Sequence, residues 1–516
     1  MQRFTLLIGC LLLGIVSINA QTLKGVCGTT HEFQTYNTEQ YIANLKAAKE
    51  MRAESRNANT VYVPIQYHII TRNNGTGGAL LKNVLAQHCH LNENFAGTNL
   101  QFYMDEAPTM IANEAIFENP TLTSSEFTMR QRRNREAINI WIVNSAGNGT
   151  IGLTLGFYTP TNDWVVIRSD QITDVNKTLA HEVGHFLSLR HTHFGWCNVP
   201  YDEAEHGNPV QDVSPGAVQG TPVGIVATEL VDGSNCEVAG DFICDTPPDY
   251  NFSFTSNGGC VYTRETMDPN GDLVDPDETL IMSQYQDRCI SNFTEMQGLV
   301  MEADIDRAAR NFLRVNPFTP LATEITDTPE LLSPIESVVT ASFNRVELRW
   351  NPVEGADSYL VEVDRSASFS IDRLNFCATS TTFLLEDILD ADRNYRWRVT
   401  PLNANYTCAG PSETGRFRTG VSTSVATIQT VDDWTIQPNP VEAATAITID
   451  VDAKTAFTAT INIFNLTGQI IQSYPATDFT AGNSKIQLPI TDLIKGVYFV
   501  ALENEEGILN KRLIVQ

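Results

Sequence analysis

The segment from His181 to His191 constrains this chain more than any other. His181 and His185 are four residues apart, so a helix places both imidazoles on one face, where they can hold one ion. Glu182 follows the first histidine and is suited to act as a general base on water. His191 can join them only if the helix ends near Ser188 and the chain turns back. The pattern predicts a zinc site with three histidine ligands and an open fourth position.

A polar helix face in solvent is the alternative interpretation of this segment. The surrounding residues argue against it, because most are apolar: Leu179, Ala180, Val183, Phe186, Leu187 and Leu189. Such a helix is expected to be buried, and buried histidine and glutamate side chains need partners. We therefore expect the three histidines to hold an ion.

The first 20 residues have the features of a signal peptide. Arg3 precedes an apolar run at residues 6–16, and a small residue, Ala20, ends the segment. Cys10 superficially matches a lipoprotein processing site, but the apolar run continues past it. No later segment has the roughly 18 apolar residues of a membrane span. A net charge of −27 argues against nucleic acid as a partner. We expect a soluble, exported protein.

The pattern of apolar residues changes along the chain. Residues 57–315 mix strands and helices, which predicts an α+β domain with a mixed twisted sheet and a zinc-binding helix. Residues 334–420 and 434–516 hold short strands separated by turns, which is typical of two all-β sandwich domains. The segments between them, 316–333 and 421–433, are expected to be linkers.

Within the α+β domain, hydrophobic periodicity predicts the individual elements. Strands are expected at residues 61–70, 100–104, 138–143, 153–157 and 164–168, and helices at 79–96 and 293–315 besides the zinc helix. Another helix is expected near residues 41–56. The strand at 153–157 is the expected sheet edge along which an extended substrate would pair.

A second candidate metal site lies in the long irregular stretch at residues 195–281. An irregular stretch inside a compact domain is usually functional or tied down by ions. Asp241, Asp245 and Asp249 stand at four-residue spacing in its densest, turn-prone part, which suits calcium. A solvated acidic turn is the alternative.

The zinc segment resembles the metzincin peptidases, and within them the pappalysin family. The resemblance spans roughly residues 25–313 and also rests on residues 192–195, 240–247, Met282 ahead of Cys289 with 293–294, and 94–102. It implies a metzincin-like catalytic domain that hydrolyses peptide bonds. The implied site consists of Glu182 as general base, His181, His185 and His191 as zinc ligands, and Asp241, Asp245 and Thr246 as calcium ligands.

The resemblance implies further roles around the zinc site. Met282 would form the hydrophobic floor beneath the ion. Tyr285 is the candidate transition-state stabiliser, although Gln284 stands where the family commonly has tyrosine. Ser188 replaces the usual glycine, and its left-handed conformation would cost about 1 kcal/mol.

Export makes disulfides expected. Of ten cysteines, Cys10 lies in the signal peptide, which leaves nine. Cys377 and Cys408 are alone in the first sandwich and are expected to pair with each other. The resemblance implies Cys260–Cys289, and Cys236–Cys244 is a plausible local pair. Cys89 and Cys197 would then remain as a loosely held fourth pair.

Cys27 is the odd cysteine and lies in the expected propeptide, residues 21–56. Some pappalysins stay latent through a propeptide cysteine, and Val26-Cys27-Gly28 resembles that segment. A thiolate can take the open position on zinc and exclude water. Cleavage near Arg52 or Arg56 would then activate the precursor. A Cys27–Cys89 disulfide is the alternative.

The two C-terminal regions also show resemblances. Residues 334–420 resemble a fibronectin type III module. Residues 434–516 resemble the C-terminal sorting domain of type IX secretion cargo, on the segments 437–440, 464–468, 496–498 and 511–515. The second resemblance implies outer-membrane secretion machinery as a partner and a location outside the cell or on its surface.

The sequence therefore predicts a secreted zinc endopeptidase that acts on proteins or peptides. The alternative from another class is a secreted adhesion or binding protein with a structural or vestigial metal site. The sandwich domain, Ser188 and Gln284 favour that alternative. A zinc hydrolase acting on other bonds is a third interpretation.

Overall fold

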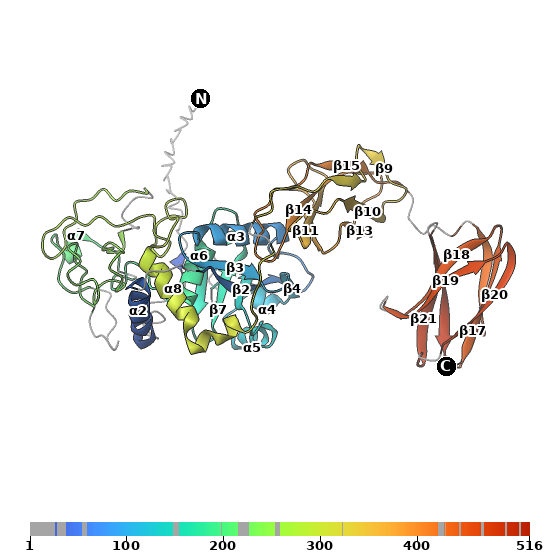
Figure 1. Ribbon diagram of the computed structural model, residues 1–516, viewed down its shortest axis with the longest axis horizontal. Helices are drawn as coiled ribbons and strands as arrows, with labels where there is room; N and C mark the ends of the chain where they lie inside the picture. The colour runs from blue at the N-terminus through green and yellow to red at the C-terminus, as the bar shows by residue number, and fades with distance from the viewer. Residues whose placement is uncertain are drawn as a thin grey trace, which may run out of the picture.

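The computed structural model describes most of the chain. The described residues are 26–27 and 38–516, with gaps at 54–58, 148–153, 198, 215–225, 253–258, 322–323, 422–427, 429, 443–444, 466–468, 491–492 and 505–506. Figure 1 shows an α/β region, a β-sandwich and a second β region following one another along the long axis. The expected signal peptide lies outside the described residues.

One seven-stranded sheet forms the centre of the α/β region. Its strands are β1 (Val26–Cys27), β2 (Val61–Thr71), β3 (Leu100–Met104), β4 (Thr109–Ala112), β5 (Ile138–Val143), β6 (Thr154–Thr159) and β7 (Trp164–Arg168). Their order is β1-β6-β7-β5-β2-β3, and β4 also pairs with β2. The pairs are parallel except that β6 runs antiparallel to β7. The mixed sheet is the one predicted, because its buried strands are the apolar runs of the sequence.

The α/β region also contains helices and 3₁₀ turns, several of which pack against this sheet. They are α2 (Thr38–Ala53), α3 (Leu81–Asn94), α4 (Glu114–Glu118), α5 (Thr123–Arg132), η1 (Ser169–Gln171), α6 (Thr178–Phe186), α7 (Glu203–His206), α8 (Glu295–Asp306) and η3 (Ala308–Arg314). α2 lies beside α8 (Figure 1). The helix predicted at 293–315 is split, because Arg307 is extended between α8 and η3.

The next region is a sandwich of two sheets, ordered β13-β10-β8 and β12-β11-β14-β15-β9. Its strands are β8 (Leu331–Ser333), β9 (Val338–Val339), β10 (Arg345–Trp350), β11 (Ser358–Asp364), β12 (Leu374–Ala378), β13 (Thr382–Glu386), β14 (Asn394–Leu402) and β15 (Gly415–Arg418). Trp350 and Trp397 pack in its core. The linker predicted at 316–333 is too long, since β8 already belongs to the sandwich.

This sandwich is fastened to the α/β region. Cys408 forms a disulfide with Cys89 of α3. The predicted Cys377–Cys408 pair is therefore wrong, and so are the alternatives that joined Cys89 to Cys197 or Cys27. The Cys377–Cys408 pairing was predicted because both cysteines lie in the sandwich. The loop after β14 instead lies on α3, where Thr407 Oγ1 donates a hydrogen bond to the Leu85 carbonyl at 2.9 Å. Cys377 is an exposed free thiol.

The C-terminal region consists of two further sheets, ordered β16-β17-β20 and β19-β18-β21-β22. The strands are β16 (Val431–Gln437), β17 (Ala446–Ala453), β18 (Phe457–Phe464), β19 (Ile470–Phe479), β20 (Gly482–Pro489), β21 (Gly496–Asn504) and β22 (Gly507–Val515). Side chains from both sheets form one core. β16 begins inside the linker predicted at 421–433, so that linker is shorter than expected. None of the helices among the described residues has the length and apolar character to cross a bilayer.

Candidate metal centre

The zinc helix α6 ends in a sharp turn. Ser188 has a φ of 73°, in the left-handed region that side chains disfavour. The Leu189 amide donates to the Gly184 carbonyl at 2.9 Å, and the Ser188 amide donates to the His185 carbonyl at 3.0 Å. These bonds close the helix as a left-handed cap does. The expected conformation of Ser188 is thus confirmed, and it returns the chain toward the helix.

The turn brings the three histidines together. The Nε2 atom of His191 lies 3.1 Å from Nε2 of His181 and 3.1 Å from Nε2 of His185. On the other side of the rings, Nδ1 of His181 faces the Ile281 carbonyl at 2.7 Å, and Nδ1 of His185 faces the Leu189 carbonyl at 2.8 Å. Carbonyls only accept, so both Nδ1 atoms carry the proton. Such contacts fix the tautomer and orientation of metal-ligating imidazoles.

This donor set fits a tetrahedral zinc ion. With Nδ1 protonated, the Nε2 atoms of His181 and His185 are both acceptors facing His191, and one proton cannot satisfy both. Zinc at about 2.0–2.1 Å from each nitrogen would separate the nitrogens by about 3.4 Å, close to what is found. Burial lowers the pKa of His181 to about 4 and holds that of His185 well below its ordinary value. Both rings are therefore neutral, the form that binds metal.

The third ring is supported by residues that follow it. His193 stacks on His191 with ring centroids 4.6 Å apart and an interplanar angle of 12°. The Cys197 sulfur lies 3.8 Å from His191 Nδ1 and is a buried free thiol. Sequence reasoning placed Cys197 in a disulfide and missed this position, because spacing alone does not show which ring a nearby sulfur faces.

Glu182 is fully buried between α6 and the sheet. Its side chain packs on Gly156 of β6, where an added Cβ would lie 3.2 Å from Glu182 Cγ. The strand β1 pairs with β6 on the edge away from β7, with Cys27 opposite Gly156. The main chain at Cys27 therefore runs alongside the strand that covers Glu182.

Met282 packs beneath the zinc helix. A Cβ at Gly184 would come within 2.5 Å of Met282 Sδ, so only glycine allows this approach. The Met282 carbonyl accepts from the Thr192 amide at 3.2 Å, and the preceding carbonyl, of Ile281, holds His181. Met282 thus lies between α6 and the segment that carries His191.

Tyr285 is buried in the core of the α/β region. Among the described residues its hydroxyl has no hydrogen-bond partner. Burial, followed by the nearby Asp249 carboxylate, raises its pKa. Its part in catalysis stays a prediction.

The three residues expected to bind calcium do not all face the same place in the acidic loop. Asp241 is fully buried, and its Oδ1 accepts from Thr246 Oγ1 at 2.8 Å and from the Ile243 amide at 2.9 Å. Asp245 instead faces the start of α8, where its oxygens accept from Thr294 Oγ1 and the Met296 amide. The structure therefore brings Thr246 to Asp241 and places Asp245 as a helix cap. The Cys236–Cys244 disulfide closes this loop, and Cys260–Cys289 is formed as well.

Glu229 is the loop residue that sequence reasoning missed. It is 4% exposed and packs against Gly240, where an added Cβ would overlap its carboxylate. Burial, then repulsion from Asp241, raises the pKa of Glu229 well above its usual value, and burial raises that of Asp241 to about 8. Asp241 Oδ2 has no hydrogen-bond partner among the described residues. Two buried carboxylates with an unused oxygen fit a divalent cation.

Comparison with known proteins supports export and a metalloprotease relationship. The family description "Secretion system C-terminal sorting domain" matches residues 435–516. A relative, "Extracellular metalloprotease 1" of Coccidioides posadasii (strain C735), is 22% identical over 304 residues, covering 54% of this chain and 88% of the relative. The predicted type IX sorting domain is present, and the protein is secreted or held at the cell surface. The sorting domain implies interaction with the secretion machinery.

Solved structures resemble only parts of the chain. The fn3 domain of the human collagen alpha-1(XX) chain is 24% identical, covers 20% of this chain and 91% of its own, and has a TM-score of 0.15. The fibronectin(III)-like modules of Clostridium thermocellum CbhA are 9% identical, cover 36% and 92%, and have a TM-score of 0.15. The sheets of this chain itself show a mixed α/β region followed by two all-β regions.

Proposed function

We propose that this chain is a secreted zinc-dependent endopeptidase of the pappalysin type, made as a latent precursor. One observation carries the proposal. The Nε2 atoms of His181 and His185 each lie 3.1 Å from Nε2 of His191, and Glu182, which follows His181, is buried. The similarity to an extracellular metalloprotease supports the same reaction class. Met282 under α6 supports the family assignment.

The chemistry follows from the positions of the side chains. A zinc ion, when bound, supplies a Lewis acid that acidifies water and polarises the scissile carbonyl. Glu182 takes one proton from the attacking water as the oxygen–carbon bond forms. It then gives that proton to the amide nitrogen as the carbon–nitrogen bond breaks. The second proton of the water passes to the amine, so the products are a carboxylate and an ammonium group, and Glu182 returns to its ionised form.

The edge of the sheet at β6 is the proposed substrate-binding strand. Glu182 packs on Gly156, so a chain paired with β6 passes close to the general base. β1 pairs with this edge in the structure, in register with Cys27 opposite Gly156. This pairing supports latency, because β1 and an extended substrate would compete for the same edge. We propose that Cys27 supplies the thiolate of the latent form.

Calcium is the proposed occupant of the acidic loop. Asp241 supplies a buried, unused carboxylate oxygen, and Glu229 supplies a second buried carboxylate. Thr246 supports Asp241 through its hydroxyl. Binding would stabilise the loop that carries Asp249, whose carboxylate accepts from Thr192 Oγ1 at 2.8 Å, next to the third histidine.

Substituting Glu182 tests the mechanism. In Glu182→Gln the ligands remain, so the protein should keep one zinc per chain. Casein cleavage should fall by at least about 100-fold, because the general base is lost. Glu126→Gln, at a part-exposed carboxylate on α5, is the matched control. Retention of cleavage in Glu182→Gln would contradict the mechanism, and casein left intact by the activated wild type would favour the adhesion alternative.

Substituting Cys27 tests the latency proposal. Cys27→Ala removes the thiolate, so the precursor should cleave casein without prior processing, or cleave itself. Cys377→Ala, at an exposed free thiol in the sandwich, is the control. A Cys27→Ala precursor that stays intact and inactive until processed would show that Cys27 does not cause latency.

A further inference from the structure

The helix α2 is part of the core of the α/β region. Tyr41, Leu45 and Ala48 are buried in the same hydrophobic cluster as the sheet, α6 and α8. α2 precedes the gap at 54–58 and the first long strand, so sequence position alone assigned it to a propeptide cut near Arg52 or Arg56. Because α2 is packed in this core, we take it to stay with the domain after activation. Its packing raises the question of what it contributes to the site.

Asn44 is the α2 residue that contacts the turn behind the metal centre. It is 2% exposed, and its Nδ2 atom donates to Ser188 Oγ at 2.9 Å. The same amide nitrogen donates to Asp304 Oδ1 of α8 at 2.9 Å. Both amide protons are therefore used. One of these protons is donated to Ser188, whose strained backbone turns the chain toward His191.

Asp304 continues this network to the end of the zinc helix. Its Oδ2 accepts from Arg310 Nε at 3.0 Å, and Arg310 Nη2 donates to the Phe186 carbonyl at 2.6 Å. Phe186 is the last residue of α6, so a buried guanidinium caps the helix at its negative end. Asn44 thus touches the turn directly and the helix end through Asp304.

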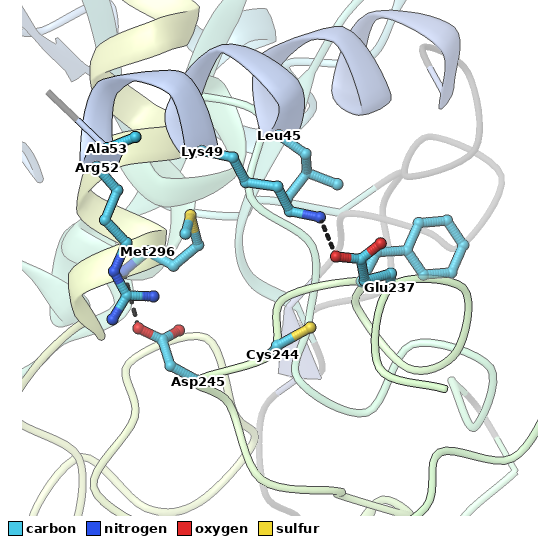
Figure 2. Close-up of a pocket in the computed structure, with 9 residues that line it drawn as sticks. Leu45, Lys49, Arg52, Ala53, Glu237, Cys244, Asp245 and Met296 are labelled. Atoms are coloured by element: carbon cyan, nitrogen blue, oxygen red, sulfur yellow. Dashed lines mark hydrogen bonds and ion pairs between the residues drawn. The ribbon is translucent and has the colours of Figure 1, made fainter. Parts of the chain in front are cut away.

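α2 makes further polar links. Thr38 Oγ1 accepts from Nη2 of Arg190, the residue before His191, at 3.0 Å. Tyr41 donates to the Asp241 carbonyl at 2.5 Å. Lys49 pairs with Glu237 at 2.6 Å and Arg52 with Glu295 at 3.0 Å, both largely in solvent. Figure 2 shows Lys49 and Arg52 reaching across a cavity of about 360 Å³ whose lining includes Cys244, Asp245 and Met296. Exposed ion pairs of this kind contribute little.

We propose that α2 is a positioning element of the metal centre and that Asn44 is its positioning residue. The inference rests on the proposed zinc site. Ser188 is strained at its positive φ, and the Asn44 amide stabilises that conformation by a buried hydrogen bond. Residues that orient metal ligands from outside the coordination sphere typically change affinity by about 10- to 100-fold.

A double-mutant cycle measured on zinc affinity tests this role. All variants are full-length chains in the Glu182→Gln background, so that none cleaves itself, and zinc binding is measured by competition with a chromophoric chelator. Asn44→Ala should raise the zinc Kd about tenfold. Lys49→Ala, which removes a solvent-exposed link of the same helix, should change it less than about twofold.

The second arm uses glycine, which adopts a positive φ without strain. In a Ser188→Gly background the turn needs less support, so Asn44→Ala should then raise the Kd no more than about threefold. The midpoint of thermal unfolding without zinc reports any general loss of stability. An Asn44→Ala effect of equal size in both backgrounds, or no effect, would overturn the inference while the zinc site stands. Absence of zinc binding in the unsubstituted chain would overturn both.

Discussion

The histidine cluster and the acidic loop are two buried sets of metal-ligand side chains built in different ways. His181, His185 and His191 come from one short segment, and backbone carbonyls hold the outer nitrogens of the first two. Glu229 and Asp241 come from separate turns, and among the described residues Asp241 Oδ2 has no hydrogen-bond partner. When the sites are empty, the His181 and His185 rings are neutral because burial lowers their pKa, whereas burial raises the pKa of both carboxylates of the second set, so that ionising them costs free energy.

This difference predicts separate roles for the two proposed ions, zinc and calcium. Removing zinc leaves neutral rings in a framework that other contacts maintain, so catalysis should be lost before stability. Removing calcium leaves buried carboxylates that must be protonated or move apart, so stability should be lost first. Asp249, bonded to Thr192, is the route by which loosening the loop would reach the histidines.

The largest expected effect comes from removing the third histidine. His191→Ala leaves two ligands, so the zinc Kd should rise more than about 100-fold, beyond the range for supporting residues. Casein cleavage should disappear, while stabilisation by calcium should be unchanged. His206→Ala, at a histidine of the same region that accepts from the Asp202 amide, is the control. Calcium stabilisation lost together with zinc would show that the two clusters are not separate.

The next largest effect is that of Glu229→Gln on the unfolding midpoint, and its sign should differ with and without calcium. In Glu229→Gln a ligand is lost, so in saturating calcium the unfolding midpoint of the α/β region should fall by roughly 5 to 10 °C, the equivalent of about 2.7 kcal/mol of binding. In a calcium chelator the same variant should unfold at a higher temperature than the wild type, since the free-energy cost of protonating one buried carboxylate is gone. Glu237→Gln, on the exposed side of the loop, should show neither shift. A wild-type midpoint that does not respond to calcium would remove the acidic loop from the comparison.

The smallest expected effect comes from crowding the floor of the histidine cluster. Gly184→Ala places a Cβ against Met282 Sδ, which should cost about 1–3 kcal/mol of stability, partly offset by alanine's better helix propensity of about 1 kcal/mol. Gly298→Ala in α8, where the nearest atom would be 3.3 Å away, is the matched control. Thermal unfolding of both variants, alone and combined with Met282→Val, measures the coupling. Equal stability of the two glycine variants would show that the Met282 side chain moves aside at little cost in free energy.

The histidine cluster was predictable because its constraint is local. Helical periodicity fixes His181 and His185, and one turn residue decides whether His191 joins them. The structure shows that turn at Ser188. The residues that hold the cluster from outside, Asn44 and Arg310, could not be predicted, since they arrive from helices 144 residues before and 124 residues after their partners.

Contacts in the acidic loop and at the domain junction could not be predicted from the sequence. Asp241 and Thr246 are close in sequence and were predicted together, whereas Glu229 packs against Gly240, next to Asp241, from a distant turn. Cys408 was assigned to Cys377 because both lie in the sandwich. Its partner is Cys89, 319 residues away, because the sandwich docks on α3. Strand pattern predicted each domain but carried no information on which surfaces meet.

Anomalous diffraction at the zinc absorption edge from crystals of the Glu182→Gln protein tests the central claim most directly. The account predicts a single strong zinc peak within about 2.1 Å of the Nε2 atoms of His181, His185 and His191. Zinc-saturated crystals with no peak among these three atoms, or with zinc only at the acidic loop, would contradict it.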